Sequence, residues 1–151
     1  MPCRDLWSRE QPRPSARHLD QAERVGRRIG QDRNDFDTEF GSTNVQLHRV
    51  AVATDLGDAG EALDVASQIN ASGLSAERQA RLLVDIARAH AQRRNVGEAM
   101  AALLDAERLA PEQVRAHHLA HETITDLLAQ SGRRPPAELV DLAGRSGADQ
   151  P

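Results

Sequence analysis

The sequence predicts an all-α protein built as a stack of antiparallel helical hairpins. Aromatic residues make up only 2% of the 151 residues, and tyrosine is absent, whereas strands of β-sandwiches and barrels favour aromatic and β-branched residues. Alanine, leucine, arginine and glutamate, which are strong helix formers, fill the chain instead. Apolar residues recur three and four positions apart, and short connections separate these segments. We find no convincing strand.

The N-terminal third of the sequence contains three different kinds of segment. Residues 1–14 carry three prolines and no helical periodicity, so we expect a poorly ordered arm. A helix is predicted over 15–30, because four apolar residues recur at helical spacing before Gly30. Residues 31–42 form a polar, acidic connection that holds both phenylalanines. The apolar residues of the first helix are Leu19, Ala22, Val25 and Ile29.

Start signals divide the rest of the chain into six further helices. The first covers about 43–56, and Asp58 is a good N-cap for the next. The further starts are at Ser75, Asn95, Pro111 and after Pro136. The helix from Pro111 is expected to continue to about Gln130, and the last one holds Leu139 and Leu142. We therefore predict one helical domain over residues 15–143, followed by a loose tail, 144–151.

An internal repeat links two of these hairpins. The segment Gly60–Leu63 reappears as Gly97–Met100, offset by 37 residues. A tetratricopeptide repeat has an alanine in its second helix, a bulky residue four positions later and a closing proline. Ala99, Leu103 and Pro111 fit this pattern, because a small residue is needed where two helices cross closely. The sequence thus predicts a tetratricopeptide-like stack, a short α-solenoid of about two complete repeats with flanking helices.

Three segments carry a resemblance to a known family. They are 32–48, which runs from Asp-Arg-Asn-Asp-Phe to Leu-His, 56–63 and 106–115. Over roughly residues 20–143, the chain resembles the C-terminal, tetratricopeptide-like region of XRE-type helix-turn-helix transcription regulators. Where that family commonly has proline, this chain has Ser42, and the family's DNA-binding domain is missing. The resemblance implies the sensory or oligomerising region of a regulator, without direct nucleic-acid binding.

Composition and charge exclude several classes of function. All 19 basic residues are arginines, so lysine Schiff bases and phosphate-loop lysines are ruled out. The net charge of −4 comes with no concentrated basic face, which argues against nucleic-acid binding. Cys3 is the single cysteine, so no disulfide framework is possible. No apolar run approaches the ~20 residues of a membrane helix, and no signal segment precedes the helices. We expect a soluble, cytoplasmic protein that is not an enzyme.

The candidate binding residues lie on the predicted first helices of the hairpins, which line the concave face of such a stack. Arginine can hold a carboxylate in a fork, and an amide can pair with a peptide backbone. We expect a protein or peptide partner, a small-molecule effector or a second copy of the chain, and no cofactor. A solvated surface is the alternative. The candidate residues are Asn44, His48, Arg81, Arg88 and Gln92.

Two clusters of possible metal ligands occur in the sequence, but neither matches a known metal-binding pattern. His117 and His121 lie one helical turn apart beside His118, but no cysteine and no HExxH order accompany them, so packing is the better interpretation. The acidic segment 32–39 does not match the ligand spacing of an EF-hand loop. Three rival interpretations stay open: a scaffold that holds no ligand, a metal-dependent enzyme that uses the histidines, and a remnant of a longer regulator.

Overall fold

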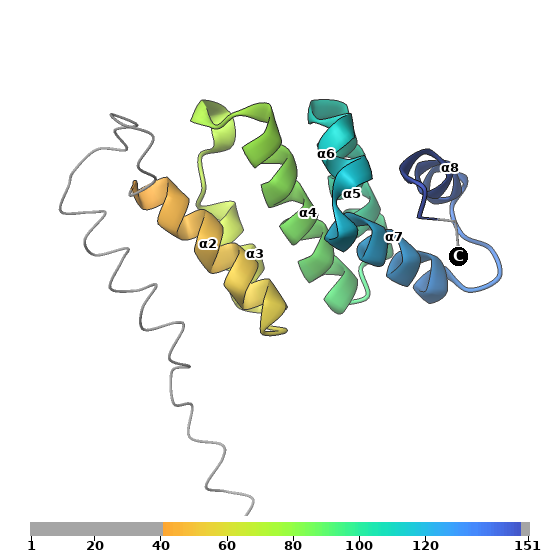
Figure 1. Cartoon of the computed structure of the whole chain (residues 1–151). Helices are drawn as coiled ribbons and strands as arrows, with labels where there is room; N and C mark the ends of the chain where they lie inside the picture. Colours follow the sequence, from red (N-terminus) through yellow and green to blue (C-terminus); the bar gives the residue numbers. More distant parts are fainter. Residues whose placement is uncertain (1–40, 149–151) are drawn as a thin grey trace, which may run out of the picture. The chain divides into compact units, whose positions relative to one another are not determined.

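The computed structural model describes residues 41–148 (Figure 1). The chain divides into two units, Met1–Arg49 and Val50–Pro151, and each is described by itself. The predicted arm over 1–14, the predicted helix over 15–30 and nearly all of the acidic connection lie outside the described residues.

The described residues form α-helices and one short 3₁₀ turn, with no strand among them, so the predicted all-α class is confirmed for this part of the chain. None of these helices combines the length and the apolar composition that a bilayer-spanning helix needs. In chain order the elements are α2 (Ser42–Asp55), α3 (Ala59–Ser67), η2 (Ala71–Gly73), α4 (Ala76–Gln92), α5 (Val96–Leu109), α6 (Pro111–Ala116), α7 (His118–Ser131) and α8 (Ala137–Ser146).

Two of the predicted helix caps are formed by side chains. Asp58 accepts a hydrogen bond from the backbone N–H of Glu61 at 3.1 Å, and Ser75 accepts one from Arg78 at 3.3 Å. Each bond satisfies a backbone donor that the first helical turn leaves unpaired. Asn95 occupies the N-cap position of α5 as predicted, but its side chain makes no capping hydrogen bond.

The prediction of one helix from Pro111 to about Gln130 is wrong, because the chain bends at His117. The backbone of this residue is extended, with φ −92° and ψ 112°, and it separates α6 from α7. The bend allows both helices to bury apolar residues in one cluster: Val114 from α6, and Ile124 and Leu127 from α7. Leu128, which unbroken periodicity would place on the same stripe as Val114, is half-buried and packs against the edge of this cluster.

The core of Val50–Pro151 lies between α4 and the helices that follow it. Helix α4 packs against α3, α5, α6 and α7, most extensively against α5. The residue predicted for the close helix crossing, Ala99, is completely buried there. On α4, helical spacing predicts a buried stripe of Leu83, Ile86, Ala87 and His90. Ala87 is completely buried as predicted, whereas the other three are half-buried. The other α4 residues in the buried core cluster are Ala80, Val84 and Ala91.

Helix α8 closes the described part of the chain. Leu139 and Leu142 are completely buried, as their spacing predicts. The helix ends at Ser146, and Gly147 follows in the left-handed conformation with φ 75°. Residues 144–146 therefore extend the helix, although we expected the loose tail to begin at 144.

The turns that precede α3 and α5 have the same hydrogen bonds. Gly57 N–H donates to the Thr54 carbonyl at 3.0 Å, and Arg94 N–H donates to the Ala91 carbonyl at 3.0 Å. Both turning residues have positive φ, 78° at Gly57 and 59° at Arg94. The next residue in each turn donates to the carbonyl five positions earlier, Asp58 at 2.8 Å and Asn95 at 2.9 Å. The offset of 37 residues seen in the sequence thus extends to the backbone geometry.

A glutamine from a later helix reaches the same carbonyl in each of these turns. Gln92 Nε2 donates to the Thr54 carbonyl at 2.8 Å, and Gln130 Nε2 donates to the Ala91 carbonyl at 2.9 Å. Both bonds join the C-terminal ends of helices that are far apart in the sequence. Hydrogen bonds therefore link the C-terminal end of α2 to that of α4, and the C-terminal end of α4 to that of α7.

Candidate functional site on helix α4

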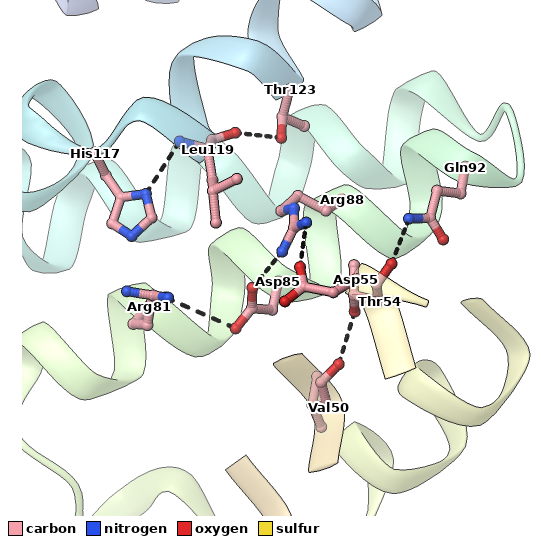
Figure 2. Close-up of polar contacts among 10 residues, drawn as sticks. All are labelled: Val50, Thr54, Asp55, Arg81, Asp85, Arg88, Gln92, His117, Leu119 and Thr123. Atoms are coloured by element: carbon pink, nitrogen blue, oxygen red, sulfur yellow. Dashed lines mark hydrogen bonds and ion pairs between the residues drawn. The ribbon is translucent and has the colours of Figure 1, made fainter. Parts of the chain in front are cut away.

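Four polar residues lie along one side of α4, and we call them the α4 polar face: Arg81, Asp85, Arg88 and Gln92 (Figure 2). Their spacings of four, three and four residues place them on one side of the helix, one above another. Three of the four are predicted candidate residues, so the structure brings this part of the candidate set together. The fourth, Asp85, is not in that set.

Asp85 is the buried centre of the α4 polar face. The residue is only 3% exposed. Arg88 Nη1 lies 3.1 Å from Asp85 Oδ1, and Arg81 Nε lies 3.9 Å from Oδ2. Burial raises the pKa of Asp85, while Arg81 and Arg88 act against this rise. A carboxylate this deeply buried needs such partners, because an unpaired buried charge is very unfavourable.

The α4 polar face is also tied to the last residues of α2. Arg88 Nη2 donates to Asp55 Oδ1 at 2.7 Å, so one guanidinium joins two carboxylates. Gln92 donates to the carbonyl of Thr54, as described above, and the Thr54 hydroxyl donates to the Val50 carbonyl at 2.8 Å. Figure 2 shows these bonds, which restrain the side chains of Arg88 and Gln92.

His117 lies at the other end of the face, on the side of Arg81 (Figure 2). Its Nδ1 accepts a hydrogen bond from the Leu119 N–H at 3.2 Å, and its ring stacks on that of His118 with centroids 5.5 Å apart. Burial lowers the pKa of His117, and electrostatic interaction with Arg81, His118, Arg88 and His121 lowers it further. This end of the face therefore combines a neutral imidazole with Arg81, whose side chain is 52% exposed.

The two remaining candidate residues lie in the first half of α2, within the unit Met1–Arg49. Asn44 is buried and His48 is exposed. Although the two residues lie four positions apart, their side chains have different surroundings. We describe the α4 polar face without them.

The clustered histidines do not form a metal centre. Within residues 41–148, no three side chains of His, Cys, Asp or Glu come close enough together to hold a metal ion. His121 is half-buried in α7, and the Nε2 atom of its ring is enclosed without a hydrogen-bond partner in the described structure. His118 is exposed and lies against His117.

Sequence reasoning missed Asp85, Asp55 and Thr54. A signal for Asp85 was present, because it follows Arg81 by four residues and precedes Arg88 by three, and these are the spacings of helical ion pairs. No comparable signal exists for Asp55 and Thr54. Their contacts depend on the packing of the end of α2 against α4.

Comparison with protein-family models, curated proteins and solved structures gave no match to this chain.

Proposed function

We propose that this chain is a non-enzymatic binding module in which the α4 polar face contacts a protein or peptide partner. In this proposal, α2–α3 and α4–α5 are two hairpins of a tetratricopeptide-like stack. The shared turn geometry at Gly57 and Arg94 supports this interpretation. From the resemblance to XRE-type regulators, we further propose that the module is the sensory or oligomerising region of a transcription regulator. We propose a cytoplasmic location for it.

The observation that carries the proposal is the buried ion network around Asp85. Well-packed apolar residues of similar volume often stabilise a protein as well as buried ion pairs do. Stability alone therefore does not account for a carboxylate that is 3% exposed and held by two arginines. A network of this kind also fixes the positions of the charges that a partner would meet.

Arg81 is the residue best placed to contact the partner. Its side chain is 52% exposed, and the ion pair with Asp85, at 3.9 Å, involves Nε. A guanidinium has five N–H donors in a planar fork, which suits a carboxylate or peptide carbonyls. Arg88, by contrast, is held between Asp85 and Asp55, and we assign it the role of positioning the network.

Selection from a displayed library of random peptides on the full chain tests the proposal. Enriched peptides are then titrated calorimetrically into the wild type, Arg81→Ala and Arg108→Ala. Arg108 is a matched control, because it also pairs with an aspartate on its own helix, Asp105 at 3.0 Å. We expect Arg81→Ala to weaken binding at least about tenfold, the size of a lost charge-assisted hydrogen bond. Arg108→Ala should leave the affinity unchanged.

Two outcomes would contradict the proposal. One is a selection that enriches no peptide. The other is a set of peptides that bind Arg81→Ala as tightly as the wild type, which would place the binding site elsewhere. Light scattering of the same variants tests the oligomerising alternative, since a dimer that is lost in Arg81→Ala would assign the face to a second copy of the chain.

A further inference from the structure

His117 has two structural roles at one point of the chain. It is the C-cap of α6 and the N-cap of α7, and its backbone is extended between them. The capping bond is made by its ring, since Nδ1 accepts from the N–H of Leu119 at 3.2 Å. The start of α7 therefore depends on an acceptor that can also bind a proton.

The capping bond requires the neutral form of the imidazole. A ring nitrogen accepts a hydrogen bond only when it carries no proton, so Nδ1 is bare and the proton of the neutral ring lies on Nε2. In the imidazolium both nitrogens carry protons. Nδ1 would then direct an N–H at the N–H of Leu119, and the capping bond would be lost.

The groups around His117 favour the neutral form. Four basic residues interact electrostatically with its ring and lower its pKa. Arg81 and Arg88 belong to α4, and His118 and His121 belong to α7. Asp85, the carboxylate on the same side of α4, is already shared by the two arginines. On α6, Arg115 pairs with Glu112 at 3.2 Å. The parallel stack with the His118 ring, with an angle of 5° between the planes, is also disfavoured when both rings are charged.

We propose that His117 makes the junction of α6 and α7 a pH-sensitive hinge, in which the neutral ring caps α7 and protonation removes the cap and loosens α6. Helix α6 has six residues and is held by its contacts with α4, α5, α7 and α8, and it contributes Val114 to the core. A helix this short has little stability of its own. Loss of the junction would release α6 while α4 and α5 stay packed. This inference does not depend on the proposed binding role.

Nitrogen NMR of the histidine rings first locates the pH at which His117 binds a proton. Hydrogen exchange of the full chain at pH 7.5 and at one pH unit below that point then tests the hinge, with each rate corrected for the intrinsic pH dependence of exchange. On acidification we expect the amides of α6 and of the first turn of α7 to lose protection about fivefold, the factor that a lost helix cap typically gives. The amides around Leu103 in α5 should keep their protection. Nitrogen NMR of the histidine rings at pH 7.5 should find the His117 proton on Nε2.

The matched variants are His117→Asn and His118→Asn. Asparagine caps helices well and does not titrate, so His117→Asn should keep α6 protected at both pH values. His118→Asn should retain the loss of protection. The proposal is overturned if the wild type shows no change, if His117→Asn shows the same change as the wild type, or if α5 loses protection together with α6.

Discussion

Gly57 and Arg94 adopt positive φ angles, 78° and 59°, at equivalent positions of two turns that lie 37 residues apart. The same backbone geometry is thus formed once by a residue suited to it and once by a residue that is strained in it. A non-glycine residue in the left-handed region is less stable by ~1–2 kcal/mol.

Substitutions at these two residues should change the free energy of unfolding in opposite directions. Gly57→Ala should lower the free energy of unfolding by about 1 kcal/mol, a purely conformational effect, since an added Cβ would meet no atom within 4 Å. Arg94→Gly should raise it by about 0.5 kcal/mol, because glycine relieves the strain but loses more entropy on folding. Urea unfolding followed by circular dichroism measures both. A loss of stability in Arg94→Gly would contradict the shared geometry.

The two carboxylates bound by Arg88 should differ in their importance for stability. Asp85→Ala removes the buried partner, and we expect a loss of about 2–3 kcal/mol, near the lower end for a broken buried pair because Arg88 keeps Asp55. Asp55→Ala removes a partner whose side chain is 60% exposed, so the loss should stay below about 1 kcal/mol. Unfolding titrations of the two variants at pH 7 test this order, and equal losses would show that Asp85 is not the centre of the network.

The close crossing of α4 and α5 predicts a large effect at Ala99. Ala99→Leu inserts a larger side chain at a completely buried position and should destabilise the fold by about 1–3 kcal/mol. Ala101 lies two residues further along the same helix and is exposed. Ala101→Leu should therefore change stability by no more than about 0.5 kcal/mol. Thermal unfolding of both variants compares them directly, and tolerance of leucine at Ala99 would mean that the helices do not approach closely there.

The ion pair between α5 and α8 should make a pH-dependent contribution to the stability of the fold. Arg145 donates to both carboxylate oxygens of Glu107 at 2.8 Å, and these hydrogen bonds lower the pKa of Glu107. A carboxylate with a depressed pKa stabilises the fold above its ordinary pKa, and this contribution disappears as the pH falls through the depressed value.

Arg145→Met should therefore melt at a lower temperature than the wild type at pH 7, and the difference should disappear in acid. Carbon NMR of Glu107 should show its pKa returning toward the ordinary value in the variant. Arg108→Met, whose partner Asp105 is exposed, is the control and should behave as the wild type does at every pH. A constant difference between Arg145→Met and the wild type from pH 7 to acid would rule out a role for the Glu107 charge.

Helix starts were predictable from the sequence because their signals are local. Asp58 and Ser75 cap their helices through backbone groups only three residues away, so no knowledge of the packing was needed. The bend at His117 was not predictable in this way. Histidine is not a usual cap, and the apolar spacing continues past it without interruption.

The α4 polar face was predictable in part. The spacing of Arg81, Arg88 and Gln92 was sufficient to place them on one side of a helix. The spacing of Asp85 from Arg81 and Arg88 indicates ion pairs but does not predict its burial, because such pairs on a helix are usually exposed and aspartate is rarely buried. That pairing uses Arg88, which is itself held by Asp55 from another helix.

The glutamine bonds at the helix ends bear on how this chain could be lengthened. Gln92 and Gln130 each donate to the carbonyl of the second-last residue of an earlier helix, Thr54 of α2 and Ala91 of α4. At the end of α7, the Ala129 carbonyl accepts the Gly132 N–H at 3.4 Å, as Thr54 does for Gly57. A tandem duplication of residues 93–130 would supply one more glutamine at the matching position. The copied segment would then carry both a glutamine donor and a carbonyl acceptor of the kind that link the ends of α2, α4 and α7.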